Sequence, residues 1–290
     1  MAQHATLSKR LVSVHPHHAE GAIVPTPLTS WQGQRVVVTG AARGIGAAIA
    51  ERLHQLGAHV VAVDLLEAAL QETANTLGIR SIPVDLGTEQ GVSDAIEGAL
   101  AQLGDIDVWV GNAGVARGSG LTAPDADWEL SWQVNVLAHV RAARLLVPRW
   151  LERGSGRFIV TASAAGLLTV LGQPAYAVTK HGAEAFAEWL AASYGHRGID
   201  VHAICPQGVR TDMYPGPGED PLAGTIGHDG TLEPADVAEA LVQAVAHGDF
   251  LVLPHPEVAD YFALRATDTD RWLRGMQRLQ ARADGQGAAR

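Results

Sequence analysis

The feature that most limits the fold of this chain is a repeated alternation of short apolar runs with longer helical patterns. Apolar, mostly β-branched runs predict strands at 35–39, 59–63, 79–84, 106–110, 157–161, 199–204 and 250–253. Helical patterns lie between them, at 47–56, 67–77, 89–103, 127–151 and 174–194. Strands that are apolar throughout and alternate with helices form parallel sheets covered on both faces. The chain is therefore predicted to be an α/β protein with a doubly wound parallel sheet of about seven strands.

The predicted sheet spans residues 34–253, which is within the size of a single α/β domain. Residues 1–33 predict a flexible N-terminal arm; its histidines offer metal binding as the alternative (His4, His15, His17, His18). Residues 254–290 carry an apolar stripe and predict a helical extension that docks over the active-site loop or on a neighbouring subunit (Tyr261, Phe262, Leu264, Trp272, Leu273, Met276, Leu279). The glycine- and proline-rich stretch 212–231 predicts a mobile lid or binding loop.

Composition excludes several classes of function. A net charge of −10 and a pI near 5.7 argue against nucleic acid as the main partner, because phosphate binding requires a basic face. The one cysteine, Cys205, lies in an apolar run, which predicts a buried inert thiol and argues against a cysteine metal site. No apolar run is long enough to span a membrane, and no signal-peptide core is present. We expect a cytoplasmic protein with neither a metal nor a membrane partner.

A glycine-rich turn follows the first predicted strand, with the sequence TGAARGIG from Thr39 to Gly46. Glycines at such a turn let the backbone approach a pyrophosphate, whose charge then lies at a helix N-terminus. The alternative is a simple strand-to-helix turn. Asp64 ends the second strand, where a carboxylate accepts hydrogen bonds from an adenosine ribose and repels a 2′-phosphate. This favours NAD, although Asp64 could instead cap the next helix, and Arg43 could pair with the 2′-phosphate of NADP.

Tyr176 and Lys180 are spaced to share one face of the helix predicted at 174–194. A tyrosine hydroxyl has an ordinary pKa of about 10, and a neighbouring ammonium favours the phenolate. A serine hydroxyl from a nearby strand end, Ser163, could hold a substrate oxygen against the phenol. These groups together can move a proton to or from an alcohol or carbonyl oxygen.

The ordered set of motifs resembles the short-chain dehydrogenase/reductase family, which has a Rossmann-type fold. The set consists of TGAARGIG, Asp85-Leu86, Asn112-Ala113-Gly114, Asn135, Ser163, and Tyr176 with Lys180. The resemblance implies that Tyr176 is the general acid/base and that Lys180 lowers its pKa and binds the nicotinamide ribose. Ser163 would orient the substrate oxygen, and Asn135 would hold a water that relays protons from Lys180.

The resemblance also implies a set of cofactor-binding residues (Gly40, Arg43, Gly44, Ile45, Gly46, Asp64, Asp85, Leu86, Asn112, Ala113, Gly114, Tyr176, Lys180, Pro206, Gly208, Val209, Thr211). Substrate would contact Ser163, Ala165, Gln173, Tyr176, Gln207 and Met213. Two positions depart from the family pattern. Gly111 stands where an asparagine is usual and loses one side-chain hydrogen bond. Gln207 stands where a glycine is usual, beside the nicotinamide, where it would narrow the pocket or add an amide donor.

The residues expected around the substrate are mostly apolar and include no obvious cation, which predicts a neutral, lipophilic secondary alcohol or ketone (Ala164, Ala165, Gly166, Leu167, Leu171, Gln173, Met213, Tyr214). The leading interpretation is therefore an NAD-dependent oxidoreductase acting on such a substrate. The alternatives are an NADP-dependent carbonyl reductase and a dinucleotide-binding regulator without turnover. The family commonly pairs its two long helices in homodimers and homotetramers, and we expect the same here through 127–151 and 174–194.

Overall fold

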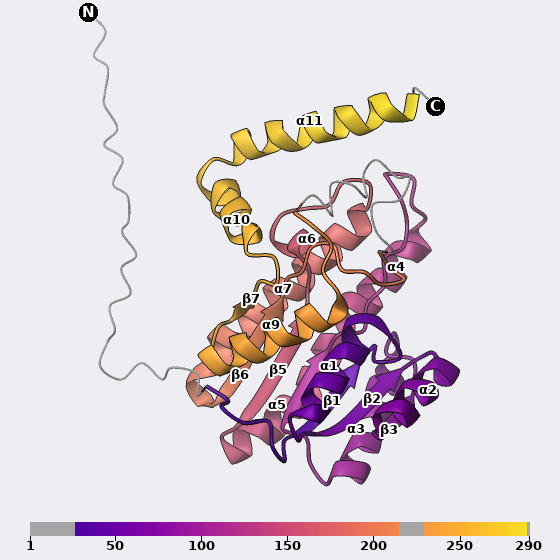
Figure 1. The fold of residues 1–290 in the computed structure, drawn as a ribbon, viewed down its shortest axis with the longest axis vertical. Coiled ribbons are helices and arrows are strands. Elements are labelled where there is room, and N and C mark those ends of the chain that lie inside the picture. Colours follow the sequence, from indigo (N-terminus) through magenta and orange to yellow (C-terminus); the bar gives the residue numbers. More distant parts are fainter. Residues whose placement is uncertain (1–26, 215–228, 289–290) are drawn as a thin grey trace, which may run out of the picture.

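The computed structural model describes residues 27–214 and 229–288, with side chains as far as residue 285. A seven-stranded parallel sheet organises this part of the chain, in the order β3-β2-β1-β4-β5-β6-β7 (Figure 1). The strands are β1 (Arg35–Thr39), β2 (His59–Asp64), β3 (Arg80–Pro83), β4 (Val108–Gly111), β5 (Gly156–Thr161), β6 (Ile199–Ile204) and β7 (Leu251–Val252). The predicted doubly wound α/β fold is confirmed.

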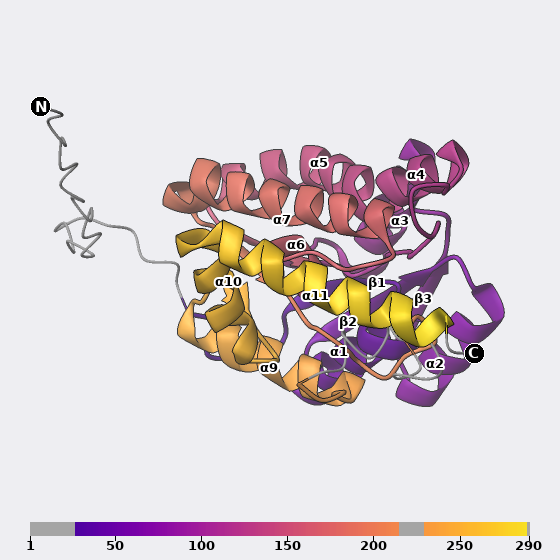
Figure 2. The ribbon, with the colours of Figure 1, turned by 90° about the horizontal axis from the view of Figure 1, so that it is seen from above.

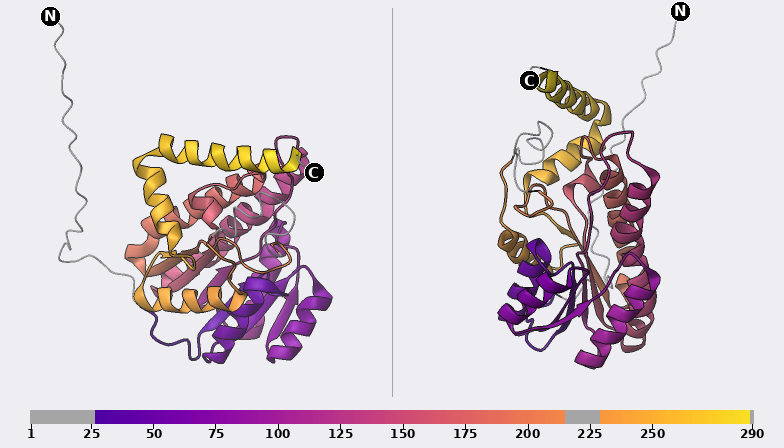
Figure 3. Two further views of the ribbon diagram at one scale, coloured as in Figure 1. Left: turned by 45° about the horizontal axis from the view of Figure 1, so that its top comes forward. Right: turned by 90° about the vertical axis from the view of Figure 1, so that its right-hand side faces the viewer.

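Helices cover both faces of the sheet, as the views in Figures 2 and 3 show. One face carries α3 (Glu89–Leu103), α5 (Ala138–Arg153) and α7 (Pro174–Tyr194), and the other carries α1 (Gly44–Gln55), α2 (Glu67–Leu77) and α9 (Pro234–His247). Each face has its own buried core. Leu146, Phe158 and Leu190 are in the first core, and Ile49, Leu53 and Leu241 are in the second. Burial of apolar surface on both faces explains why the strands are apolar throughout.

The long helix predicted at 127–151 is interrupted. It consists of α4 (Asp125–Trp132), a π-helical turn η1 (Gln133–Leu137) and α5. Such turns arise when one extra residue enters the helical ladder, and they occur often at functional sites. Asn135 lies in the middle of this turn and is completely buried. The interruption therefore turns a polar side chain inward.

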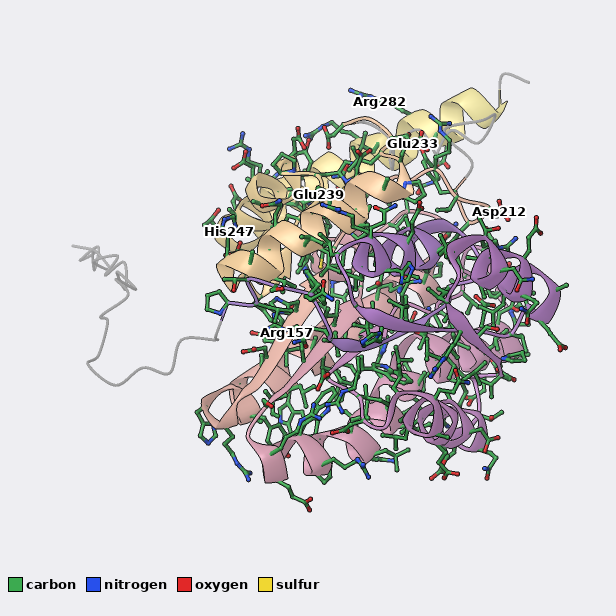
Figure 4. All side chains as sticks on the ribbon, turned by 60° about the horizontal axis from the view of Figure 1, so that its bottom comes forward. Arg157, Asp212, Glu233, Glu239, His247 and Arg282 are labelled. Atoms are coloured by element: carbon green, nitrogen blue, oxygen red, sulfur yellow. The ribbon has the colours of Figure 1, made fainter. Side chains whose placement is uncertain are left out.

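Helix α9 is absent from the predicted elements, because it follows the glycine- and proline-rich stretch. It begins with a capping box between Glu233 and Asp236 and a proline in its first turn. It packs on α1, where the Arg52 guanidinium contacts the Glu239 carboxylate at 2.9 Å. Figure 4 labels Glu239 on α9 and Glu233, its N-cap residue. A four-residue helix, α6 (Ala164–Leu167), and a single 3-10 turn, η2 (Gly195–Arg197), were also not predicted.

The ends of the chain differ in part from the expectation. The arm expected at 1–33 is too long, because Trp31 is buried in the second core and the Leu28 N–H donates to the Val245 carbonyl. Residues 1–26, with the expected histidine cluster, lie outside the described residues. The C-terminal extension forms α10 (Glu257–Thr267) and α11 (Thr269–Ala288), as its stripe predicted. Among the described helices, none is long and apolar enough to cross a membrane.

Candidate active site

A cavity of about 1170 Å³ opens at the carboxyl ends of the strands. It lies beside β1 and β4, the neighbouring strands from which the chain winds outward in opposite directions. In open α/β sheets, ligands bind at this switch point. The cavity is lined by residues that follow β1, β2, β4, β5 and β6 and by the start of α7. The fold thus brings the predicted motifs to one site.

The glycine-rich turn is tightly packed against the turn after β4. Gly40 has a φ of +63°, and a Cβ there would lie 2.8 Å from the Ala113 Cα. A Cβ on Gly46 would lie 2.1 Å from the Gly40 carbonyl oxygen. Asn112 fastens this contact, since its Nδ2 donates to the carbonyls of Thr39 and Gly40. Glycine is therefore required here for the approach of one backbone to another.

The N-terminus of α1 faces this turn and has no side-chain cap, since Arg43 makes no capping hydrogen bond at its N-cap position. No acidic residue occupies its first turn. Unsatisfied N–H groups at a helix N-terminus, with the positive end of the helix dipole, bind anions. The Gly44–Gln55 helix therefore fits the pyrophosphate of a dinucleotide without a basic side chain.

Asp64 ends β2 at the cavity and supports two backbone segments. Its Oδ2 accepts from the Ala42 N–H and its Oδ1 from the Leu66 N–H, each at 3.0 Å. The carboxylate therefore braces the glycine-rich turn and the segment that leads into α2, although α2 itself has no side-chain cap. Its role toward a ribose stays a prediction. Asp64 is partly exposed on the cavity wall, with lone pairs left for a ribose hydroxyl.

Arg43, the group that kept NADP in question, forms an ion pair with Asp212. Both side chains are exposed, at 60% and 67%. Next to them, a Cβ on Gly44 would lie 3.1 Å from the Thr211 Cγ2. The turn after β1 and the loop after β6 thus meet at the cavity, and the guanidinium already has an anionic partner.

Tyr176, Lys180 and Ser163 are brought together on one wall. Tyr176 is in the first turn of α7, and Lys180 lies one turn later with its Nζ 5.7 Å from the centre of the Tyr176 ring. Lys180 is buried, and its Nζ donates to the Thr161 carbonyl at 2.7 Å. Ser163, two residues beyond β5, accepts from the Ala165 N–H at 3.1 Å and caps α6. The predicted triad is therefore assembled by β5, α6 and α7.

The electrostatics of these groups differ from the expectation. Burial raises the pKa of Tyr176 above its ordinary value, while a hydrogen bond with Ser163 acts in the lowering direction. The net shift of the Tyr176 pKa is upward because burial outweighs this hydrogen bond, and the lowering by Lys180 stays a prediction. Burial also lowers the pKa of Lys180 to about 8. Cys205 is fully buried, and burial raises the pKa of its thiol to about 12, which confirms an inert thiol.

Asn135 lies behind the cavity wall and makes three hydrogen bonds. Its Oδ1 accepts from the Val115 N–H, and its Nδ2 donates to the Val115 carbonyl and to the Thr179 Oγ1. Asn135 Oδ1 and Lys180 Nζ each lie 3.3 Å from the position of a Cβ on Gly114. The two polar atoms therefore face one small space, which glycine leaves open.

Gln207 replaces the usual glycine without backbone strain, because no non-glycine residue in the described part of the chain has a positive φ. Its N–H donates to the Nδ1 of buried His255 at 3.2 Å. Its Oε1 is buried in the cavity wall and has no hydrogen-bond partner among the described residues. The side chain thus brings an acceptor without a described partner to the cavity wall, and the narrowed pocket and the amide donor stay predictions.

Most predicted site residues line the cavity (Gly40, Arg43, Gly44, Ile45, Asp64, Asp85, Leu86, Asn112, Ala113, Gly114, Ser163, Ala165, Gln173, Tyr176, Lys180, Pro206, Gln207, Val209, Thr211, Met213). Three do not. Asn135 and Gly46 are packed behind the wall, and the Gly208 carbonyl accepts from the Leu232 N–H. The predicted lid at 212–231 falls mostly on residues 215–228, outside the described part.

Several lining residues were not assigned to the site from the sequence. Arg117 adds a cation to the cavity lining, whereas the residues expected around the substrate include none. Tyr261, Trp272, Met276 and Leu279 come from α10 and α11. Their apolar stripe was visible in the sequence, but a stripe does not say which surface it covers.

Fold and site together define an oxidoreductase that uses a nicotinamide dinucleotide and acts on alcohol or keto groups. The family model for short chain dehydrogenases matches residues 34–220. The chain belongs to the short-chain dehydrogenase/reductase family.

Known relatives agree with this assignment. The chain is 34% identical over 250 residues to 1-deoxy-11-beta-hydroxypentalenate dehydrogenase of Streptomyces exfoliatus, covering 83% of this chain and 89% of the relative. It is 30% identical over 200 residues to the 3-oxoacyl-(acyl-carrier-protein) reductase FabG of Salmonella typhimurium, covering 68% and 82%.

Two solved structures share the fold. A short-chain dehydrogenase/reductase from Burkholderia phymatum in complex with NAD has a TM-score of 0.75 and 26% identity, covering 84% of this chain and 96% of the other. L-sorbose reductase from Gluconobacter frateurii, complexed with NADPH and L-sorbose, has a TM-score of 0.70 and 29% identity, covering 77% and 95%. These neighbours support a nicotinamide dinucleotide, with both cofactor types represented.

Proposed function

We propose that the protein interconverts a neutral, lipophilic secondary alcohol and its ketone with NAD as cofactor. The observation that carries this proposal is the meeting of Tyr176, Ser163 and Lys180 at one wall of a cavity whose lining is mostly apolar. The dinucleotide supplies the hydride acceptor or donor. The protein's own groups must then position the substrate oxygen and move its proton.

Tyr176 is the proton donor in ketone reduction and the acceptor in alcohol oxidation. Its raised pKa keeps the phenol protonated at neutral pH, which suits donation to a carbonyl oxygen. The Ser163 hydroxyl holds the same oxygen and favours charge on it. Lys180 binds the nicotinamide ribose while the Thr161 carbonyl fixes its ammonium. Asn135 and Lys180 share the space before Gly114, which suits one relay water.

NAD is proposed over NADP because of two carboxylates. Asp64 stands at the end of β2, where it accepts from a ribose hydroxyl and repels a 2′-phosphate. Arg43, the cation that would offset this repulsion, is paired with Asp212. The Burkholderia neighbour is a complex with NAD, and the sorbose reductase is a complex with NADPH.

A second candidate substrate class is a lipophilic hydroxy or keto acid. Arg117 on the cavity wall favours it, and the name of the Streptomyces relative denotes such an acid. Arg117→Ala should then lose activity on carboxylates and keep activity on neutral alcohols. If Arg117→Ala and wild type had the same activity on the acids, and also on the neutral alcohols, a carboxylate substrate would be disfavoured.

The assembly proposed is a homodimer or homotetramer through the outer faces of α5 and α7. These faces expose large apolar side chains, namely Leu145 at 43%, Val178 at 50% and Trp189 at 54%. Large apolar side chains exposed on neighbouring helices favour a protein interface. The single, buried Cys205 also fits the reducing cytoplasm in which we place the protein.

The reaction is tested by absorbance of reduced nicotinamide, with NAD⁺ and a panel of neutral secondary alcohols at mildly alkaline pH. Tyr176→Phe should lower kcat by about 10²- to 10⁴-fold, the range for loss of a general acid/base. Tyr194→Phe is the matched control, because Tyr194 ends the same helix and contacts Trp189 away from the cavity. Tight NAD⁺ binding without turnover of any alcohol would favour a dinucleotide-binding regulator instead.

A further inference from the structure

Helices α10 and α11 lie across the end of the molecule at which the active-site cavity opens. Figure 2 shows α11 crossing above the strand ends, with α7 on one side and α9 on the other. Figures 1 and 3 show it as the outermost layer at that end. The extension is therefore placed where it can act on whatever occupies the cavity.

Side-chain contacts fix α10 to the catalytic domain. Val258 is completely buried in the core beneath α7. The Tyr261 hydroxyl donates to the Asp229 carboxylate at 3.0 Å, and the Arg265 guanidinium donates to the Leu167 carbonyl of α6. These contacts set the direction in which the chain leaves α10.

Arg265 also joins the two helices. Its guanidinium carbon lies 5.8 Å from the centre of the Trp272 ring, within range of a cation–π interaction. The same arginine thus contacts α6, next to Ser163, and the first turns of α11. Arg265 thus links the start of α11 to α6, the helix that Ser163 caps.

The apolar side chains of α11 point to the cavity. Trp272, Met276 and Leu279 recur at i, i+4 and i+7, on one helical face, and all three line it. The arginines of the helix are exposed on other faces (Arg271, Arg274, Arg278, Arg282). A helix with this pattern is stable only where its apolar face is covered.

The apolar face of α11 borders a cavity that is continuous with the reaction site. Leu168, Val170 and Leu171, between α6 and α7, line the same cavity as Tyr176 and Ser163. It therefore has a polar end at the phenol and further apolar walls at 168–171 and on α11. An occupant that fits it has a carbonyl or hydroxyl group at one end and a hydrocarbon body at the other.

We propose that α11 is the roof of the substrate compartment and binds the hydrocarbon body of an extended lipophilic alcohol or ketone. This inference rests on the proposed function, since it assigns a size and polarity to the substrate of the same site. Met276 and Leu279 are specificity-determining residues, which contact the part of the substrate remote from the reacting carbon.

The test compares 2-decanol with 2-butanol, using NAD⁺ and full-length protein. Met276→Ala/Leu279→Ala should lower the ratio of kcat/KM for 2-decanol to that for 2-butanol at least tenfold, about 1.4 kcal/mol of transition-state binding. Met276→Glu, which places a charge in the apolar compartment, should lower the ratio further. Leu273→Ala is the matched control, because Leu273 is on the same helix, 45% exposed and outside the lining. The proposal would be overturned if Met276→Ala/Leu279→Ala and Met276→Glu left the ratio of the two kcat/KM values unchanged. It would also be overturned if Leu273→Ala lowered this ratio equally.

A binding measurement separates this inference from the proposed reaction. Intrinsic fluorescence of the NAD⁺-saturated protein is titrated with 2-decanone, a complex in which no hydride transfer occurs. Weaker 2-decanone binding in Met276→Ala/Leu279→Ala, with no turnover of alcohols by wild type, would support the roof and refute the reaction. Turnover by wild type with equal 2-decanone affinity in the variant would support the reaction and refute the roof.

Discussion

Gly111 and His139 share one space in the core of the sheet, since a Cβ on Gly111 would lie 2.5 Å from the His139 Nδ1. His139, on α5, is buried, and burial lowers its pKa to about 3. The imidazole therefore packs in its neutral form against the end of β4. The His139 ring thus occupies the space that the side chain of the family's usual asparagine would need at position 111.

Restoring the family's asparagine should destabilise the protein. Gly111→Asn would force the His139 ring to move, and overpacking of a filled core costs about 1–3 kcal/mol. We expect a lower free energy of unfolding in urea for this variant. Gly111→Asn/His139→Ala should recover part of the loss, because it removes the clashing ring. A fully additive double variant would show that the two positions are independent.

The elements predicted best are those whose signal is local. The helices 67–77, 89–103 and 174–194 agree with α2, α3 and α7 at both ends, because apolar periodicity and glycine or proline boundaries coincide there. The π turn at Asn135 was not predictable from local sequence, because Asn135 forms its hydrogen bonds with residues far along the chain, Val115 and Thr179.

Within the site, the motif residues were predictable and their partners were not. Tyr176, Lys180 and Ser163 stand out by type and spacing. The Arg43–Asp212 pair and the cavity contacts of Trp272 join segments far apart in the chain, and only the fold brings them together. The raised pKa of Tyr176 likewise follows from burial, which spacing along a helix does not report.

Ser163 should affect the pH profile as well as the rate. The hydrogen bond between Ser163 and Tyr176 lowers the pKa of Tyr176, whereas burial raises it. Oxidation needs the phenolate, so kcat for alcohol oxidation should rise with pH. Ser163→Ala should reduce kcat and shift that rise to higher pH. A reduced kcat with an unshifted profile would limit Ser163 to orienting the substrate. Ser119→Ala is the control, because it removes an exposed hydroxyl of the cavity lining and should leave the pH profile unshifted.

Cofactor preference should respond to the partner of Arg43. Asp212→Asn removes the carboxylate that occupies the guanidinium and leaves Arg43 available to a 2′-phosphate. Because exposed ion pairs contribute only about 0–1 kcal/mol, we expect kcat/KM with NADP⁺ to rise relative to NAD⁺ by no more than about fivefold. Steady-state kinetics with both cofactors measure this ratio. Asp249→Asn, at an exposed position outside the cavity, is the control, and an equal rise there would exclude a local effect.

The proposed assembly should depend on the exposed face of α7. Trp189→Asp places a charge where the proposed interface buries an exposed tryptophan, and this should shift the mass measured by light scattering toward the monomer. Leu66→Asp is the control. That side chain is also exposed, at 43%, but it precedes α2, which covers the face of the sheet opposite α7. A wild-type monomer at micromolar concentration would refute the assembly itself.

Stability should fall in mild acid because of His202. Its Nε2 lies 3.1 Å from the guanidinium of Arg157, the residue labelled in Figure 4. Because a guanidinium only donates, Nε2 accepts, and Nδ1–H donates to the Asp249 carbonyl at 2.6 Å. Burial, with the charge of Arg157, lowers the pKa of His202 to about 4. The folded protein therefore keeps His202 neutral while the unfolded chain takes up a proton below pH 6.5.

This stabilisation is complete above pH 6.5 and is lost as the pH falls toward 4, and His139 adds the same effect toward about 3. Each histidine contributes a slope of up to about 1.4 kcal/mol per pH unit in that window. His202→Gln should reduce the slope of the unfolding free energy between pH 6 and 4.5 by about this amount. His196→Gln changes an exposed histidine of the neighbouring 3-10 turn and should leave the slope unaltered. Equal slopes in wild type and His202→Gln would mean that His202 is protonated in the folded state over this range.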